Sequence, residues 1–243
     1  MQKLRITAVN VCRFVLAATF IFSGYVKAID PLGTLYKLKD YAAAMSLNGL
    51  LPDWVLVGVA IALGALEFAL GVFMLFAVRR HVVSRIMLAF MTAMTVLTLW
   101  IFVADPVKDC GCFGDALKLT NGETLLKNIV LIACAALVAW RPVDMARFIS
   151  RSNQWIVRYY TVAYIVITSV YCLYTLPIFD FRPYHVGMNI KQGMEIPEGA
   201  EQPEFESTFL LRKNGETREF TLDNYPDSTW EYVDTRTVQT KKG

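Results

Sequence analysis

Residues 54–78 read WVLVGVAIALGALEFALGVFMLFAV, an apolar stretch that contains a single charged side chain, Glu67. A helix needs about 20 apolar residues to cross the hydrocarbon core of a bilayer, and this stretch is longer. Small residues, which let membrane helices approach one another closely, recur along it at Gly58, Gly64, Ala65 and Gly71. The stretch therefore predicts a tightly packed membrane-spanning helix.

Further apolar runs occupy residues 9–29, 86–103, 125–140 and 155–179. Of the 243 residues, 55% are hydrophobic and only 19% are charged, which is unlike a soluble domain. We therefore expect an all-α membrane protein: a four-helix transmembrane bundle plus a fifth transmembrane helix. The first run is long, carries charges and lacks a small-residue cleavage site, so it is expected to be a retained helix. Residues 32–53 have the spacing of an amphipathic helix at the interface.

The distribution of arginine predicts the orientation of the chain. Every loop arginine falls on one side of the membrane if the chain crosses five times, and by the positive-inside rule that side is cytoplasmic. The arginines concerned are Arg5, Arg79, Arg80, Arg85, Arg141, Arg147, Arg151 and Arg158. We expect a protein of the bacterial inner membrane whose N-terminus is cytoplasmic. The 105–127 loop and the C-terminus then lie in the periplasm.

The composition becomes polar near residue 181, which divides the chain into three expected parts. Residues 1–150 form the four-helix transmembrane domain, 151–180 the fifth helix, and 181–243 a small periplasmic β-rich segment or part of a larger domain. In the last part, residues 206–213 and 216–222 alternate in polarity around Asn214 and Gly215, a strong hairpin signal. Residues 229–238 are expected to form a further strand.

The loop sequence CGCFGD at residues 110–115 is the main candidate for chemistry. Cys110 and Cys112 would face an oxidising compartment, where disulfides form and persist. A Cys-x-Cys disulfide closes a small, strained ring, and strain makes a disulfide easier to reduce. Glycines at 111 and 114 relax the backbone restrictions of such a ring. The pair therefore favours thiol–disulfide exchange, with a structural disulfide or a zinc half-site as alternatives.

The remaining cysteines and the histidines give little support to other chemistry. Cys12, Cys134 and Cys172 lie in apolar runs and are expected to be small core residues. His81 and His185 are the only histidines and lie far apart in the chain, so no metal site is predicted. A net charge of +3 is too small to indicate a nucleic-acid partner.

Glu67 is a second candidate, because an ionisable residue in the middle of a membrane helix is costly and usually functional. Its expected partner is Arg13 or Lys27 of the first run, with Asp30 close to Lys27 in the sequence. Lys27 by itself is expected to snorkel to the interface. A membrane clamp, a proton-handling group and a small-solute transporter all remain open for Glu67. Tyrosines 159, 160, 164, 171 and 174 could line a quinone pocket or form an interfacial aromatic belt.

Three motifs resemble the DoxX/MauE superfamily: FSGYVKAIDP at residues 22–31, GALEFALG at 64–71 and CGCFG at 110–114. The last is similar to the motif of MauE, the membrane component of methylamine-utilisation clusters. The whole chain also resembles DoxX-like membrane proteins of Bacteroidetes. The resemblance implies a four-helix core like that of vitamin K epoxide reductase-type enzymes. It implies Cys110 and Cys112 as a redox pair, supported by Lys27 and Glu67. The chain departs from the reductase pattern in having Cys-x-Cys in a loop instead of Cys-x-x-Cys at a helix end.

Together these observations predict an integral membrane thiol–disulfide redox protein that exchanges electrons with a periplasmic thioredoxin-like partner. A quinone is the candidate cofactor for the exit of electrons. The alternative is a non-enzymatic assembly factor, as in methylamine-utilisation-type maturation, whose cysteines are structural.

Overall fold

The computed structural model describes residues 2–45, 51–105, 111–114, 116–181, 187–191, 204–213, 216–221, 224, 226 and 229–241. The chain separates into two compact units, residues 1–186 and 187–243. The first is helical and the second carries a small sheet. Each unit is described by itself below.

Five helices of the first unit are long and apolar enough to cross a membrane. They are α1 (Gln2–Ile29), α3 (Asp53–Leu75), α4 (Arg80–Ala104), α5 (Asn121–Trp140) and α6 (Gln154–Tyr174). The short helix α2 (Pro31–Ala44) follows α1, and a single 3-10 turn, η1 (Pro142–Asp144), follows α5. The predicted all-α membrane fold with five spanning helices is confirmed.

The helices begin earlier than the apolar runs that predicted them. Helix α1 starts at Gln2 instead of residue 9, and α4 starts at Arg80 instead of residue 86. Hydropathy marks the part of a helix that lies in hydrocarbon, whereas the backbone hydrogen-bond pattern continues into polar residues at either end. The interface helix α2 is shorter than expected and ends at Ala44.

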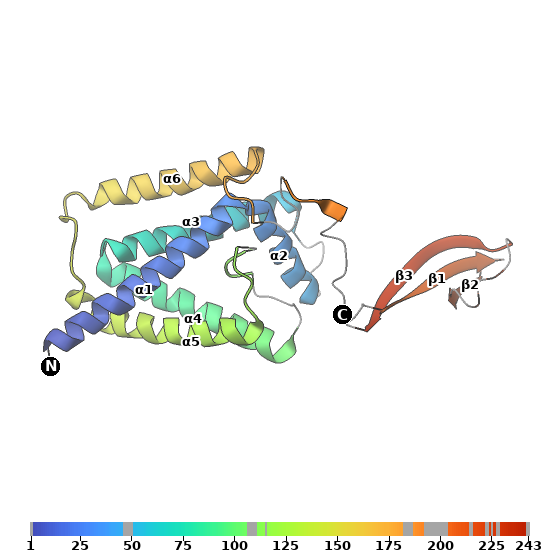
Figure 1. Cartoon of the computed structure of the whole chain (residues 1–243), viewed down its shortest axis with the longest axis horizontal. Coiled ribbons are helices and arrows are strands. Elements are labelled where there is room, and N and C mark those ends of the chain that lie inside the picture. The colour runs from blue at the N-terminus through green and yellow to red at the C-terminus, as the bar shows by residue number, and fades with distance from the viewer. Residues whose placement is uncertain are drawn as a thin grey trace. The chain divides into compact units, whose positions relative to one another are not determined.

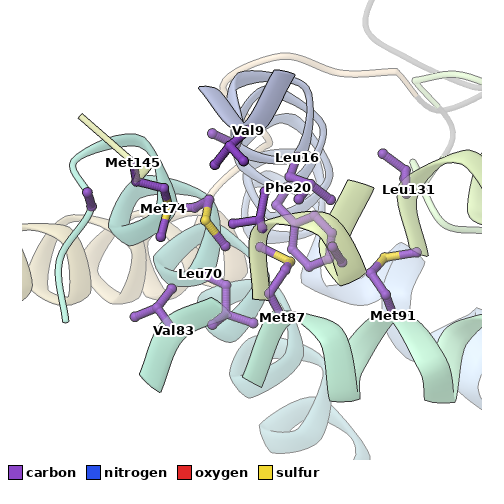
Figure 2. Close-up of a cluster of buried hydrophobic side chains, with 14 residues drawn as sticks. Val9, Leu16, Phe20, Leu70, Met74, Val83, Met87, Met91, Leu131 and Met145 are labelled. Atoms are coloured by element: carbon purple, nitrogen blue, oxygen red, sulfur yellow. The ribbon is translucent and has the colours of Figure 1, made fainter. Parts of the chain in front are cut away.

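Helix α1 lies along α3 and also packs on α5, while α4 packs on α5 and α6 packs on α3 and α1 (Figure 1). The larger of two clusters of buried apolar side chains is drawn from all four of α1, α3, α4 and α5 (Figure 2). Leu16 of α1, Met74 of α3 and Met87 of α4 are at most 1% exposed within it. Methionine is common in this cluster because its flexible side chain fills the irregular gaps between helices.

The contact between α1 and α3 depends on glycine at particular positions. A Cβ on Gly24 would collide with the backbone of Gly64 and Phe68, and a Cβ on Gly71 would come within 2.6 Å of the Ile21 nitrogen. The two backbones therefore touch where they cross, as small residues allow in membranes. The prediction of close packing is confirmed at Gly64 and Gly71. It is wrong at Gly58, where a Cβ would meet nothing within 4 Å.

The second unit contains a three-stranded antiparallel sheet in the order β2-β1-β3. Its strands are β1 (Glu204–Lys213), β2 (Glu216–Thr221) and β3 (Glu231–Lys241). The pairing of Lys213 with Glu216 confirms the predicted hairpin, although its turn at 214–215 lies outside the described residues. Among the residues of this unit whose side-chain burial the structure describes, Leu211 is the one that is fully buried. A thin core is what the polar composition of the sheet predicts.

Candidate thiol site

Cys112 lies in a tight turn over residues 111–114, between α4 and α5. The Gly114 nitrogen donates to the Gly111 carbonyl at 3.0 Å, and both glycines have positive φ angles, +60° and +54°. Left-handed backbone strains residues that carry a Cβ, so this turn needs glycine at both places. The predicted role of the two glycines in a Cys-x-Cys ring stays a prediction. Cys110, Asp109 and Asp115 lie outside the described residues, so the disulfide state of the pair is not described.

The turn descends between the helices instead of lying above them. Cys112 and Phe113 line the same small cavity as Met91 and Met94 of α4. Met94 precedes the end of α4 at Ala104 by ten residues, which is about 15 Å along a helix. Phe113 is only 7% exposed, and its ring lies 5.4 Å from that of Phe22. Irregular backbone at such a depth is tolerated only when protein surrounds it.

A buried ion pair holds this turn in place. The Lys27 ammonium lies 2.8 Å from Oε2 of Glu67, and the two side chains are 5% and 4% exposed. The same ammonium donates to Oγ of Ser23 at 2.8 Å and to the carbonyl oxygen of Cys112 at 2.6 Å. All three donors of the ammonium therefore have an acceptor, which a buried charge requires.

Ser23 completes the arrangement, which we call the anchor cluster: Ser23, Lys27, Glu67 and the Cys112 carbonyl. Its hydroxyl oxygen lies 2.7 Å from Glu67 Oε2 and 2.6 Å from the Cys112 oxygen. A hydroxyl carries one proton, so it donates to one of these oxygens at a time. The anchor cluster satisfies a backbone carbonyl that would otherwise be buried without a partner, a loss that costs free energy in a bilayer.

The cavity beside the anchor cluster has room for water. Its volume is about 30 Å³, enough for one or two water molecules, and Glu67, Lys127 and Asn128 supply polar groups to its wall. The ammonium of Lys127 lies 4.2 Å from the centre of the Phe113 ring, a cation–π contact. Asn128 donates to Oγ1 of Thr98 at 3.1 Å and so ties α5 to α4.

Of the two expected partners of Glu67, Lys27 forms the ion pair and Arg13 does not. Arg13 is fully buried and donates to the Ala146 carbonyl, with its guanidinium over the rings of Phe14 and Phe148. The expectation that Lys27 snorkels to the interface is wrong, because the ion pair with Glu67 offsets the cost of burying its charge.

Asp30 has a local structural part. Its carboxylate accepts from the Gly33 nitrogen at 2.9 Å and caps the first turn of α2. It also lines a second small cavity together with Gly111 and Gly114, on a different side of the turn from the anchor cluster. Asp30 therefore helps to set the wall against which the turn packs.

The other cysteines lie inside the bundle, as predicted. Cys12 and Cys134 pack against the main apolar cluster, while Cys172 is 5% exposed. Cys12 precedes Ser23 by eleven residues on α1, about 16 Å along the helix, so direct exchange with Cys112 would need a large movement. Among the described residues there is no group of three or more histidine, cysteine or acidic side chains placed to hold a metal.

The α6 tyrosines form no enclosed pocket in the part of the chain that the structure describes. Each of the five is more than half exposed, from 51% for Tyr164 to 84% for Tyr174. Such exposure is typical of an aromatic belt, but the Tyr164 ring also packs on α3, 5.9 Å from the ring of Phe68. Tyr159 also lines an open hollow of about 540 Å³ on α6, and a quinone site and an aromatic belt both stay predictions for these tyrosines.

Sequence reasoning missed two contributors to this site. Ser23 lies in the motif at residues 22–31, and its spacing of four residues from Lys27, which puts both side chains on one face of α1, is the signal that could have found it. Lys127 falls at the end of the loop predicted over residues 105–127, but it belongs to α5 and contacts Phe113. No local signal in the sequence shows that a loop 85 residues further along reaches the face of α1 that carries Lys27.

The fold and the site define an integral membrane protein in which an internal ion pair holds a buried turn that carries a cysteine. The family model described as "Methylamine utilisation protein MauE" matches residues 5–141, which include the whole anchor cluster. The chain therefore belongs to the MauE family. Residues 205–242, the sheet, match a "Domain of unknown function (DUF8463)". Comparison with curated proteins gives no match. Comparison with solved structures gives none either.

Proposed function

We propose that this MauE-family protein is a membrane thiol–disulfide redox protein in which Cys110 and Cys112 are the reactive pair. The observation that carries the proposal is the buried position of the Cys112 turn, which an ion pair and a serine hold by its backbone. A buried ion pair is costly and a hydrophobic replacement is often no less stable. The presence of the Lys27–Glu67 ion pair is explained if the protein needs Cys112 at a fixed position.

The reaction is exchange between two dithiol/disulfide couples. A thiolate of the pair attacks one sulfur of a partner's disulfide, which gives a mixed disulfide and releases the other partner sulfur as a thiolate. The second cysteine then attacks the mixed disulfide. The partner leaves as a dithiol and a Cys110–Cys112 disulfide remains, so two electrons and two protons have passed to the partner. The reverse sequence reduces the pair.

The surroundings of Cys112 suit this chemistry. Lys27, Lys127 and Glu67 place charged groups around the turn, and a cation beside a cysteine is a feature of reactive thiols. The cavity has space for a water molecule between Cys112 and Glu67, through which protons could reach the carboxylate. Because every donor of Lys27 is in use, the anchor cluster acts as a positioning device and the chemistry falls to the cysteines.

The proposal also covers the redox partner, the orientation in the membrane and the relation to DoxX-type proteins. A thioredoxin-like protein on the periplasmic face of the bacterial inner membrane is the proposed partner, since such proteins present an exposed reactive disulfide. A quinone or a second dithiol would take or supply the electrons on the membrane side. Kinship with DoxX-type membrane proteins is proposed on the motifs around Lys27 and Glu67.

The test is thiol trapping in membranes equilibrated with graded glutathione or dithiothreitol buffers. The expected result is that Cys110 and Cys112 interconvert between thiol and disulfide at potentials near those of thioredoxin-like proteins. Cys112→Ser should abolish this change and should trap a mixed disulfide with the partner through Cys110. Cys12→Ser and Cys134→Ser are matched controls and should leave the trapping pattern unchanged.

A non-enzymatic assembly factor is the second candidate. It is favoured by the family description, which concerns methylamine utilisation, and by the fact that the anchor cluster binds a carbonyl and not the thiol. If Cys110 and Cys112 stay in one state across the whole range of potentials, the redox proposal fails and the structural reading stands. If Glu67→Gln abolishes function while Cys112→Ser does not, a transporter becomes the better explanation.

A further inference from the structure

The end of the bundle opposite the cysteine turn contains a basic hollow of about 380 Å³. We call it the arginine hollow. Its polar lining comes from the α3–α4 turn and from the segment that leads into α6: Arg79, Arg80, His81, Arg147, Arg151 and Gln154. The Arg79 nitrogen donates to Oε1 of Gln154 at 3.2 Å, which joins the two sides.

Positive charge in this region is far from balanced. Residues 79–85 and 141–158 together contain seven arginines and one carboxylate, Asp144. That carboxylate is occupied by Nε of Arg5 at 2.8 Å. Arg147 and Arg151 both act electrostatically on Arg80. Clustered like charges repel, so a bound anion would stabilise this end of the bundle.

One arginine of the hollow is fixed and the others are free to reach a ligand. Nη1 of Arg80 donates to the carbonyls of Val143 and Met145, at 2.7 Å and 3.3 Å. Its Nε is buried and has no hydrogen-bond partner among the described residues. Arg147 and Arg151 are exposed at the mouth. Guanidinium groups so placed can bind a phosphate group through paired hydrogen bonds.

Exposed apolar side chains adjoin these charges. Val82, which lines the hollow, is 50% exposed. Phe148 and Trp155, the residues that follow Arg147 and Gln154, are 57% and 52% exposed. The hollow also lies at the ends of membrane-spanning helices, where lipid headgroups meet water. Charge and apolar surface together match a molecule that has both an anionic phosphate and acyl chains.

We infer that the arginine hollow binds the phosphate headgroup of an anionic phospholipid. The site holds α3, α4 and the segment before α6 together through a lipid at the membrane surface. Basic pockets at the ends of membrane helices bind such headgroups by charge and hydrogen bonding. The inference rests on the membrane fold and is independent of the proposed redox function.

The test compares the full-length protein, purified in a neutral detergent, with the double variant R147Q/R151Q. Phosphatidylglycerol or phosphatidylcholine is titrated in, and bound lipid is counted by native mass spectrometry while thermal unfolding is followed. Phosphatidylglycerol should bind wild type in preference and raise its unfolding temperature. The double variant should bind phosphatidylglycerol about tenfold more weakly or worse.

The matched control is K39Q/K118Q, which removes two positive charges away from the hollow and should bind phosphatidylglycerol as wild type does. The single variant R151Q provides a milder change, with an intermediate loss expected, should the double variant not fold. Equal binding of phosphatidylglycerol by R147Q/R151Q and wild type would overturn the inference. Full stabilisation by inorganic phosphate alone would also overturn it, because the site would then be one for a soluble anion.

Discussion

Helix α1 buries two cations, Arg13 and Lys27, and it satisfies them in different ways. Lys27 meets a carboxylate, a hydroxyl and the carbonyl of the cysteine turn. Arg13 meets the Ala146 carbonyl and two aromatic rings, and its Nε and Nη2 have no hydrogen-bond partner among the described residues. The ion pair fixes one backbone position with several directional bonds. The arginine holds the 141–153 segment through looser contacts.

Buried charges therefore serve two purposes in one helix: they position a site at Lys27 and attach a connecting segment at Arg13. At Lys27 the charge is neutralised locally, so the cluster is specific and each member depends on the others. At Arg13 a delocalised guanidinium stays buried because it is more weakly hydrated than an ammonium and stacks on rings. The first arrangement serves a site that must be positioned, and the second serves the attachment of a connecting segment.

The strongest way to break the comparison is Glu67→Leu. It should destabilise the protein by about 3–5 kcal/mol, because it leaves the Lys27 ammonium buried without its counter-charge. Unfolding in detergent measures the loss. The double variant K27M/E67L should recover most of the stability and still leave the Cys112 turn without its anchor. Recovery of normal thiol trapping in that double variant would contradict the positioning role.

Gly24→Ala should be the next largest effect, on the order of 2–3 kcal/mol. The added methyl would collide with the α3 backbone and push α1 away from Glu67. Gly58→Ala is the matched control, because a Cβ there meets nothing and alanine favours the helix by about 1 kcal/mol. Thermal unfolding of the two variants should move in opposite directions. A higher unfolding temperature for Gly24→Ala than for wild type would show that α1 and α3 do not touch at Gly24.

Arg13→Met sharpens the other side of the comparison. It removes the bond to Ala146 and the contact with Phe148, but it also removes a buried charge, so a net loss of only about 1–2 kcal/mol is expected. Limited proteolysis should show easier cleavage in residues 141–153. Labelling of Cys112 should stay at the wild-type rate, and a changed rate would mean that the two cations are coupled.

The smallest effect is expected for Arg5→Gln. Its ion pair with Asp144 is partly exposed, with the Arg5 side chain 41% accessible, and such pairs contribute about 1 kcal/mol or less. The loss should shrink further as salt is raised, since exposed charges are screened. Chemical unfolding at low and high salt checks this. A loss as large as that of Glu67→Leu would remove the distinction between the two ends of α1.

The positions of the spanning helices could be predicted from sequence because hydropathy is a local property. The hairpin of β1 and β2 was equally readable, since strand alternation and the Asn214-Gly215 signal lie next to each other in the chain. Helix ends were less well predicted, because Lys3 and Arg5 are polar and yet remain helical.

Half of the candidate site was visible in the same way. Glu67 stood out as one charge in an apolar run, and the glycines around Cys112 indicated a tight turn. The sequence left two candidate partners for Glu67, Arg13 and Lys27. Their positions along α1 do not show which of the two side chains faces α3. Packing at Gly24 and Gly64 settles this, because it sets which face of α1 meets that helix.

By itself, the sequence determined that this chain is a five-helix membrane protein with a cysteine pair in a loop and ionisable residues inside the bundle. These features follow from composition and short-range spacing. Only the tertiary structure decided that Lys27 pairs with Glu67 and that the Cys112 turn descends to meet them. The physical reason is that a buried charge and a buried carbonyl must each find partners, and those partners lie 40 and 85 positions away from Lys27 along the chain.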